Sequence, residues 1–216
     1  MSTRNTVIIT LALIAIALVF SLAIYSHLPS QTASHWDVND QVNGSMPRFW
    51  GAFMMPLIAV AMLGLFLLIP AIDPLKVNIA KFREIFNAFI VVIVVFMLYI
   101  HFLTLLWNLG YQDFRMGTAI LPAMGLIFIF SGLLMRKAKR NFFIGIRTPW
   151  TLSSDNVWDQ THRVGSWLFI ASGILAFAGM LVPGPTAFMF VLIPVIASAI
   201  FLIIYSYILY QKETTG

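Results

Sequence analysis

Residues Thr6–Ser26 read TVIITLALIAIALVFSLAIYS, an apolar run with no charged residue inside it. A helix of about 20 such residues is long enough to cross the roughly 30 Å hydrocarbon core of a bilayer. Arg4 precedes the run, as a basic residue does in a secretory signal peptide. However, the apolar stretch is longer than a typical signal-peptide core, and no clean cleavage site of small residues follows it. We therefore expect an uncleaved transmembrane helix.

Five similar apolar runs follow along the chain. The six predicted spans cover residues 6–26, 49–72, 85–107, 117–135, 164–182 and 187–210. Composition agrees with this interpretation, because 60% of the 216 residues are hydrophobic and 10% are charged, whereas a soluble domain is about 25% charged. The sequence thus predicts an all-α, multi-pass protein of the cell membrane, in which residues 1–216 form a single transmembrane domain, a bundle of six helices in contact with the lipid bilayer.

The basic residues predict the orientation of this bundle. Loops rich in Lys and Arg remain on the cytoplasmic side of a membrane. If the N- and C-termini are cytoplasmic, only Arg48 and Arg115 of the thirteen basic residues lie outside. The other eleven then lie inside: Arg4, Lys76, Lys81, Arg83, Arg136, Lys137, Lys139, Arg140, Arg147, Arg163 and Lys212. Two loops are long enough to carry function, an outer loop over residues 27–48 and an inner loop over residues 136–163.

Several functional classes lack their usual residues in this chain. Ion-coupled transporters carry buried charged side chains on the ion path, whereas here no Asp, Glu, Lys or Arg lies deep in a predicted span, and His101 is the only histidine inside one. The chain lacks cysteine, the H-E-x-x-H and G-x-S-x-G motifs and a phosphate-binding glycine loop. We expect no enzymatic activity, no catalytic residue, no metal site and no cofactor. The net charge of +5 is explained by topology, so we expect no direct binding to nucleic acid.

The inner loop contains the most informative stretch, NFFIGIRTPWTL at residues 141–152. Gly145 permits a backbone turn that other residues resist. Thr148 precedes Pro149 and is therefore biased toward extended geometry, so a helix should end there and restart afterwards, capped by Ser153 or Ser154. Two interpretations remain open: an interfacial elbow anchored by Arg147 and Trp150, or a cytoplasmic recognition surface.

This stretch resembles the signature of a known family. The pattern Asn141-x-x-x-Gly145-Ile146-Arg147-Thr148-Pro149-Trp150-Thr151-Leu152, followed by Val157-Trp158-x-x-Thr161-His162-Arg163, is similar to that of the SdpI family of bacterial and archaeal membrane proteins. In the outer loop, Leu28-Pro29, His35-Trp36, Asn39 and Gly44 resemble the N-terminal region that accompanies this signature. The resemblance spans essentially the whole chain.

The resemblance implies a function and two candidate sites. The member that gives the family its name confers immunity to a secreted killing peptide, and it sequesters a small winged-helix repressor that binds DNA. The family signature implies binding residues in the inner loop, on the cytoplasmic side: Asn141, Gly145, Arg147, Thr148, Pro149, Trp150, Thr151, Trp158, Thr161 and His162. We expect a peptide toxin outside and a repressor inside as partners.

The outer face offers the second candidate site. Pro56, Pro122 and Pro194 lie at similar depth near the outer ends of their predicted helices, as does His101. Proline frees a backbone carbonyl inside a helix, so kinks at one level predict a shallow outer cavity. We expect His35, Trp36 and Asp37 to cover it, with Pro29 and Asn39 nearby in the same loop. The alternative is that the prolines are merely tolerated there and the loop is only a cap.

Two rival functions remain beside an SdpI-like role. The first is transport or binding of a small solute or peptide through the outer cavity. The second is intramembrane hydrolysis, which the sequence supports least because no nucleophile–base pair is visible in it.

Overall fold

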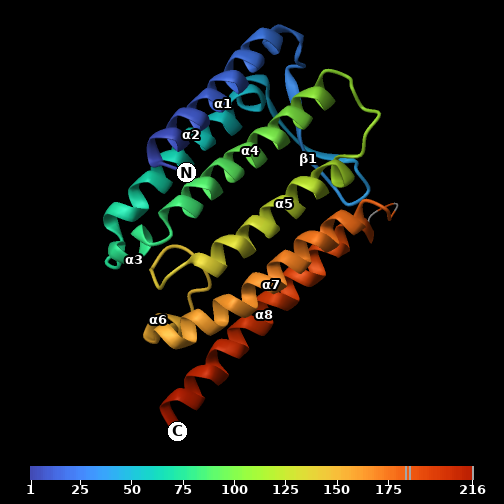
Figure 1. Cartoon of the computed structure of the whole chain (residues 1–216). Coiled ribbons are helices and arrows are strands. Elements are labelled where there is room, and N and C mark those ends of the chain that lie inside the picture. The colour runs from blue at the N-terminus through green and yellow to red at the C-terminus, as the bar shows by residue number, and fades with distance from the viewer. Residues whose placement is uncertain (183, 185, 216) are drawn as a thin grey trace.

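The protein is built mainly of long helices that lie alongside one another (Figure 1). The computed structural model describes residues 1–182, 184 and 186–215. Five of the described helices are long and apolar enough to cross a membrane. They are α1 (Thr3–Ile24), α2 (Arg48–Ile72), α4 (Arg83–Asn108), α5 (Met116–Lys137) and α8 (Thr186–Thr215). Each of them corresponds to a predicted span.

The remaining long helix, α7 (Asp155–Gly179), differs most from its predicted span. It begins at Asp155 rather than Val164, because the Ser154 side chain accepts a hydrogen bond from the Val157 N–H and caps the helix there. Its first turns are polar, and α7 is not among the five candidate spans. The sixth span therefore stays a prediction.

The predicted outer loop contains a β-hairpin, so the all-α prediction was wrong in this segment. β1 (Gln31–Trp36) pairs antiparallel with β2 (Val42–Pro47), after a single 3₁₀ turn, η1 (Tyr25–His27). The turn forms because Asp37 Oδ1 accepts hydrogen bonds from the N–H groups of Asn39 and Gln41. Aspartate favours such turns, and this signal in the sequence was not used.

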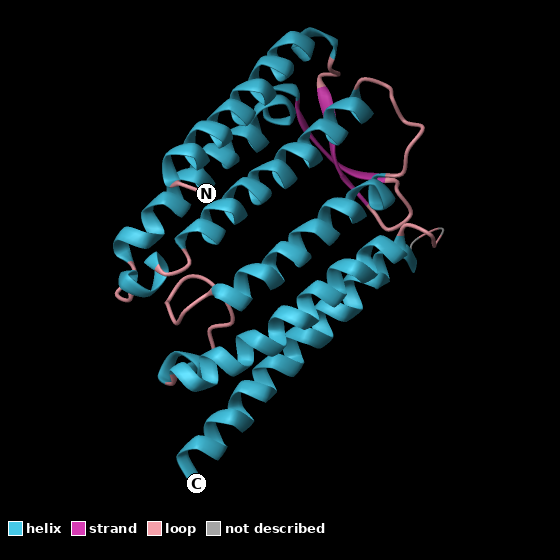
Figure 2. Ribbon diagram, viewed as in Figure 1, coloured by secondary structure: helices cyan, strands magenta, loops and turns pink. Residues whose placement is uncertain are grey.

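The helices form two groups that meet at α4 and α5 (Figure 2). In the first group α1, α2 and α4 pack together, and in the second α5 and α8 both pack against α7. Glycines bring α5 and α7 very close: a Cβ atom on Gly132 would lie 2.6 Å from the Ser166 carbonyl oxygen, and one on Gly125 would lie 2.9 Å from that of Gly173. Small residues permit such close approach in membrane helices.

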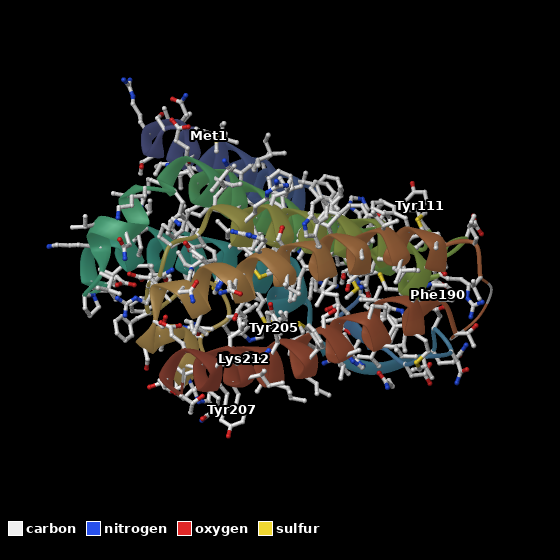
Figure 3. All side chains as sticks on the ribbon, turned by 60° about the horizontal axis from the view of Figure 1, so that its bottom comes forward. Met1, Tyr111, Phe190, Tyr205, Tyr207 and Lys212 are labelled. Carbon is white, nitrogen blue, oxygen red and sulfur yellow. The ribbon has the colours of Figure 1, made fainter. Side chains whose placement is uncertain are left out.

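The molecule has two ends of different construction. The hairpin end carries β1, β2 and the connection from α4 to α5. The motif end carries α3 (Lys76–Ala80), α6 (Pro149–Ser153), the segment 138–148 and both chain termini. In Figure 3, Tyr111 marks the hairpin end and Lys212 lies toward the motif end. Because both termini lie at one end, the chain crosses between the ends an even number of times.

The largest cluster of buried apolar side chains lies at the motif end. It includes Phe86 and Ile90 of α4, Ile79 of α3 and Trp158 of α7. Outward-facing positions are instead apolar and exposed, such as Val19, Leu22 and Ile193, at 66%, 64% and 61%. An apolar exterior around a helical bundle is what a lipid environment favours.

Candidate functional site

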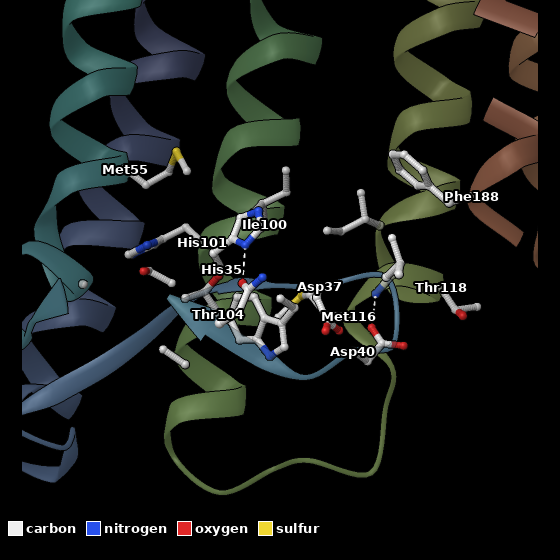
Figure 4. A pocket seen from close by; sticks show the side chains of 18 of the residues that line it. His35, Asp37, Asp40, Met55, Ile100, His101, Thr104, Met116, Thr118 and Phe188 are labelled. Carbon is white, nitrogen blue, oxygen red and sulfur yellow. Dashed lines mark hydrogen bonds between the residues drawn. The ribbon is translucent and has the colours of Figure 1, made fainter. Parts of the chain in front are cut away.

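A cavity of about 650 Å³ lies beneath the β-hairpin, between the two helix groups (Figure 4). Both strands, α2, α4, α5 and α8 contribute side chains to its wall. Met55 of α2 and Phe188 of α8 lie on opposite sides of it. The volume is in the range of small-ligand sites, which are usually concave and mostly apolar.

Most of the wall is apolar and rich in methionine. Met46 of β2, Met54 and Met55 of α2, and Met116 of α5 all line the cavity, with Ile100 of α4 among them. Methionine is unbranched and polarisable, so it fits apolar groups of varied shape. The wall therefore suits a flexible or variable apolar ligand.

Two histidines supply polar groups to the cavity. His35 of β1 is exposed toward it and forms a short hydrogen bond with the Asn43 side chain (Figure 4). His101 of α4 is only 2% exposed, and its Nε2 is 2.9 Å from the hydroxyl of Ser21 in α1. The second interaction joins α1 to α4 across the core. His101 is thus held at the cavity wall in a fixed orientation.

Asp40 fastens the hairpin tip to α5. Its carboxylate forms an ion pair with Arg115 at 2.8 Å and accepts a hydrogen bond from the Gly117 N–H at 2.7 Å. Asp40 adopts a φ of 60°, a left-handed conformation that aspartate tolerates better than most residues. The hairpin is therefore connected to the second helix group through one side chain.

The structure brings four of the six outer candidate residues together. His35, Trp36, Asp37 and His101 all line the cavity. Pro29 and Asn39 do not: the Pro29 carbonyl accepts a hydrogen bond from Arg48, and Asn39 lies in the turn of the hairpin, outside the cavity wall. Pro56, Pro122 and Pro194 lie inside α2, α5 and α8 but are not part of the cavity wall. The hairpin rather than the kinks forms the roof.

Sequence reasoning missed several residues of this site. Met54 and Met55 lie within the predicted span over residues 49–72, and Met46 and Asp40 within the predicted outer loop, so residue type alone did not distinguish them. Asn108, at the end of α4, binds both backbone groups of Ala33 in β1. An asparagine that follows an apolar span was the signal that could have indicated such a contact.

At the motif end, Asn141 organises the segment that follows α5. It is fully buried, its Oδ1 accepts hydrogen bonds from the N–H groups of Phe143 and Ile144, and its Nδ2 donates to the carbonyls of Lys139 and Ile144. Every polar atom of this side chain is therefore bound within the loop. Asp73, which the sequence analysis did not single out, is buried nearby and accepts from the Phe142 N–H at 2.9 Å.

His162 and Trp158 form the centre of the motif. The indole donates a hydrogen bond to the Ala138 carbonyl at 3.0 Å and stacks on the imidazole at a centroid distance of 3.9 Å. His162 Nε2 is 3.0 Å from the Ile146 N–H, while Nδ1 is 2.9 Å from the Trp158 carbonyl. His162 precedes the predicted span over residues 164–182. Burial lowers its pKa to about 4, although the Trp158 carbonyl and Asp159 oppose the shift.

Gly145 is required by this contact. It has a φ of +111°, and a Cβ atom there would collide with the His162 ring. Thr148 and Thr151 form a capping box that starts α6, and the Thr148 hydroxyl lies 3.0 Å from that of Ser206 in α8. Thr161 is buried as well, and its hydroxyl has no partner among the described residues.

Four of the ten inner candidate residues reach the surface. Gly145, Arg147 and Pro149 are exposed, and Trp150 is half-buried against Tyr207 at a centroid distance of 5.1 Å. Arg147 donates to the Phe142 carbonyl at 2.8 Å. Asp159 of α7 forms an ion pair with Lys139 at 3.0 Å. Six of the ten inner candidate residues are thus buried, and four reach the surface.

Two separate segments of the chain match known protein families or domains. Residues 137–206 match the SdpI/YfhL protein family, and residues 12–60 match a domain of unknown function, DUF1648. The chain is 24% identical to the immunity protein SdpI of Bacillus subtilis (strain 168), over 95% of this chain and 96% of that protein. No solved structure matches the chain.

These findings agree with the apolar helices in indicating a multi-pass protein of the cell membrane. They also confirm the resemblance that the sequence motifs predicted. Residues 137–206 are similar to the SdpI/YfhL protein family, and the chain as a whole is similar to the immunity protein SdpI.

Proposed function

We propose that this protein is an SdpI-like immunity protein that crosses the membrane six times and binds a secreted toxic peptide from outside. In this proposal the apolar part of α7, from Val164 onward, forms the sixth span, the hairpin end faces outward and both termini are cytoplasmic. The distribution of charge supports the orientation, because the hairpin end holds only two basic residues, Arg48 and Arg115.

The observation that carries the proposal is the apolar cavity beneath the hairpin, in a chain similar to an immunity protein over nearly its whole length. A peptide arriving from outside would reach the hairpin first. Its apolar groups would enter the methionine-lined wall, while His35, Asp37 and His101 would provide polar contacts that fix its orientation.

Binding fits this architecture better than transport. The motif end below the cavity is filled by buried side chains, including Phe86, Ile90 and Trp158. A solute that entered the cavity would meet this core before the cytoplasmic face. The arrangement therefore supports capture of a ligand, whereas a transporter needs a second conformation in which this core opens.

Hydrolysis has a structural candidate that the sequence did not reveal, the Ser21–His101 pair. However, Ser21 is fully buried and is not part of the cavity wall, so its hydroxyl is shielded from any ligand there. A nucleophile must reach the reacting atom. The pair is better explained as a link between α1 and α4.

Relay to a cytoplasmic repressor is the second part of the proposal. The surface available for such a partner includes Arg147, Pro149 and Trp150, whereas most other residues of the inner candidate site are buried. Arginine and tryptophan are among the residues that contribute most strongly to protein interfaces.

Survival of toxin-exposed cells tests the immunity function. We expect the chain, expressed in Bacillus subtilis cells that lack their own SdpI, to restore growth in the presence of the toxin. His35→Ala and His101→Gln should lower protection at least tenfold at equal membrane abundance, whereas Tyr111→Phe, outside the cavity, should protect fully. Failure of the parent chain to protect, when blotting shows it in the membrane, would reject the immunity function.

A further inference from the structure

The two edges of the β-hairpin differ in whether their outward-facing backbone groups are hydrogen-bonded. On β1, the Ala33 N–H donates to Asn108 Oδ1 at 2.7 Å, and Asn108 Nδ2 donates to the Ala33 carbonyl at 3.0 Å. The asparagine side chain thus occupies the place that a peptide group of a neighbouring strand would take. The outer edge of β1 is closed at this point.

On β2, Ser45 has backbone groups that face the other way. Opposed residues of an antiparallel pair alternate between those that exchange hydrogen bonds and those that do not. Ala33 lies opposite Ser45 and gives both its backbone groups to Asn108, so this pair is of the second kind. The N–H and C=O of Ser45 therefore point away from β1, and no described residue outside the hairpin binds them.

This free edge lies beside the cavity. Asn43 and Met46, which flank Ser45 along β2, both line the cavity, and Ser45 itself is exposed. Natural proteins protect exposed edges with lysine, with proline or with a covering segment. Lysine is absent from β2, and its proline, Pro47, is its last residue. The edge is therefore open to another strand.

Trp36 offers a further unmet hydrogen bond at the same site. It lines the cavity, and its indole N–H is buried without a partner among the described residues. A buried donor that lacks an acceptor costs free energy, which a ligand carbonyl would recover. The cavity thus combines an apolar wall, one unpaired donor and one open strand edge.

We propose that the ligand of this cavity is an extended peptide segment that adds to β2 as a third strand. Its backbone pairs with the N–H and C=O of Ser45, one of its carbonyls accepts from Trp36, and its apolar side chains enter the methionine-lined wall. This inference rests on the proposed function and specifies how a peptide toxin is held. Strand addition draws affinity from the main chain, so it tolerates variation in the side chains of the ligand.

Backbone methylation of a probe peptide tests the pairing directly. The parent protein in lipid nanodiscs is titrated with a fluorescent, capped octapeptide of alternating Leu and Thr, and with two methylated counterparts, each carrying N-methyl groups on one of the two sets of alternate backbone nitrogens. We expect the peptide whose N-methyl groups block pairing with the β2 edge to bind about tenfold more weakly than the unmethylated peptide. Trp36→Phe and Ser45→Pro should weaken binding of the unmethylated peptide to a similar extent. Two controls should bind as the parent does: Ser45→Ala, which keeps the backbone N–H, and Trp167→Phe, the same change of ring remote from the cavity.

Each outcome decides between explanations. Equal binding of the unmethylated peptide and both methylated peptides overturns strand addition, and so does parent-like binding by Trp36→Phe and Ser45→Pro together. Displacement of the peptide by oleate, with no effect of methylation, would identify an acyl-chain site and also reject the proposal. The survival assay stays separate: cells that are protected while methylation has no effect keep the immunity function and lose only the strand pairing. Conversely, methylation-sensitive binding without protection of the cells keeps the strand pairing and rejects the immunity function.

Discussion

The hairpin end and the motif end differ in how their polar residues are bound. At the motif end, Asn141 and His162 direct their polar atoms to backbone groups of the same segment, although the Thr161 hydroxyl lacks a partner among the described residues. At the hairpin end, the Trp36 N–H and the edge of β2 at Ser45 are left open beside a cavity. Buried polar groups that are fully satisfied make a structure rigid and specific. The comparison teaches that a long, distinctive motif can be the part of a protein that maintains the fold, while binding groups lie in a less distinctive loop.

Gly145→Val should reduce stability the most, because it disrupts the packing of the motif end directly. A branched side chain disfavours the φ of +111° and collides with His162, which also breaks the hydrogen bond to Ile146. We expect a loss of about 4 kcal/mol in stability, seen as a lower midpoint of thermal unfolding in detergent. Gly64→Ala is the matched control, since a Cβ atom on Gly64 meets nothing within 4 Å. Equal unfolding midpoints for the two variants would contradict a rigid motif end.

Acidification should have the second-largest effect, and it should also destabilise the motif end. The folded protein holds His162 with a pKa near 4, below the 6.5 of an unperturbed histidine, so unfolding takes up a proton between these values. The contribution of neutral His162 is complete above pH 6.5 and is lost as pH falls toward 4, on the order of 3 kcal/mol. The parent should lose more stability than His162→Gln over this window. Parallel pH profiles of the two proteins would rule out His162 as the cause.

Asp40→Asn should have a smaller effect, confined to the hairpin end. The substitution removes the charge that pairs with the half-exposed Arg115 but keeps an oxygen for the Gly117 N–H. We expect a stability change of about 1 kcal/mol or less, together with faster amide exchange in β1 and β2. Hydrogen–deuterium exchange measures this locally, with peptides of the motif end as internal control. Faster exchange spread over the whole molecule would mean that the two ends do not differ in rigidity.

Arg147→Ala should change stability least, by about 0.5 kcal/mol, because the side chain is exposed and makes one hydrogen bond, to Phe142. It nevertheless tests the exposed part of the motif end. If this surface binds a repressor, a reporter of that repressor should stop responding to toxin while blotting shows unchanged membrane abundance. An intact response at equal abundance would remove Arg147 from the proposed interface. A parallel fall in abundance and response would instead favour the elbow.

The helices could be predicted because their signal is strong and repeated. Long apolar runs gave five of the spans within a few residues, since only a helix satisfies its own backbone in lipid. The start of α7 agrees with the predicted helix cap, because Ser154 was one of the two candidates. The predicted span began only at Val164, since the polar residues 155–163 have no apolar signal. The hairpin was missed because its strands are short and partly polar, so no regular alternation identifies them.

The candidate sites were predicted unevenly for a physical reason. His35, Trp36, Asp37 and His101 could be grouped by depth in the membrane, and they do line one cavity. At the motif end, residue types alone could not separate an interface from an interior, because Asn141 and His162 suit either. Which backbone group each one binds depends on the path of the chain. Pairings such as Asn108 with Ala33 depend on tertiary geometry and leave no pattern in the sequence.

The hairpin is bound to both helix groups: β2 continues directly into α2, Asn108 of α4 binds Ala33, and Asp40 binds α5. Since glycines hold α5 and α7 at close backbone contact, we expect these two helices to move together as a rigid pair. A rotation of this pair against α4 would stretch the hairpin or break its contact with Asp40 or Asn108. In the proposed topology, the α5–α7 pair is therefore a direct mechanical connection between the hairpin and the Trp158–His162 stack at the other end of the molecule.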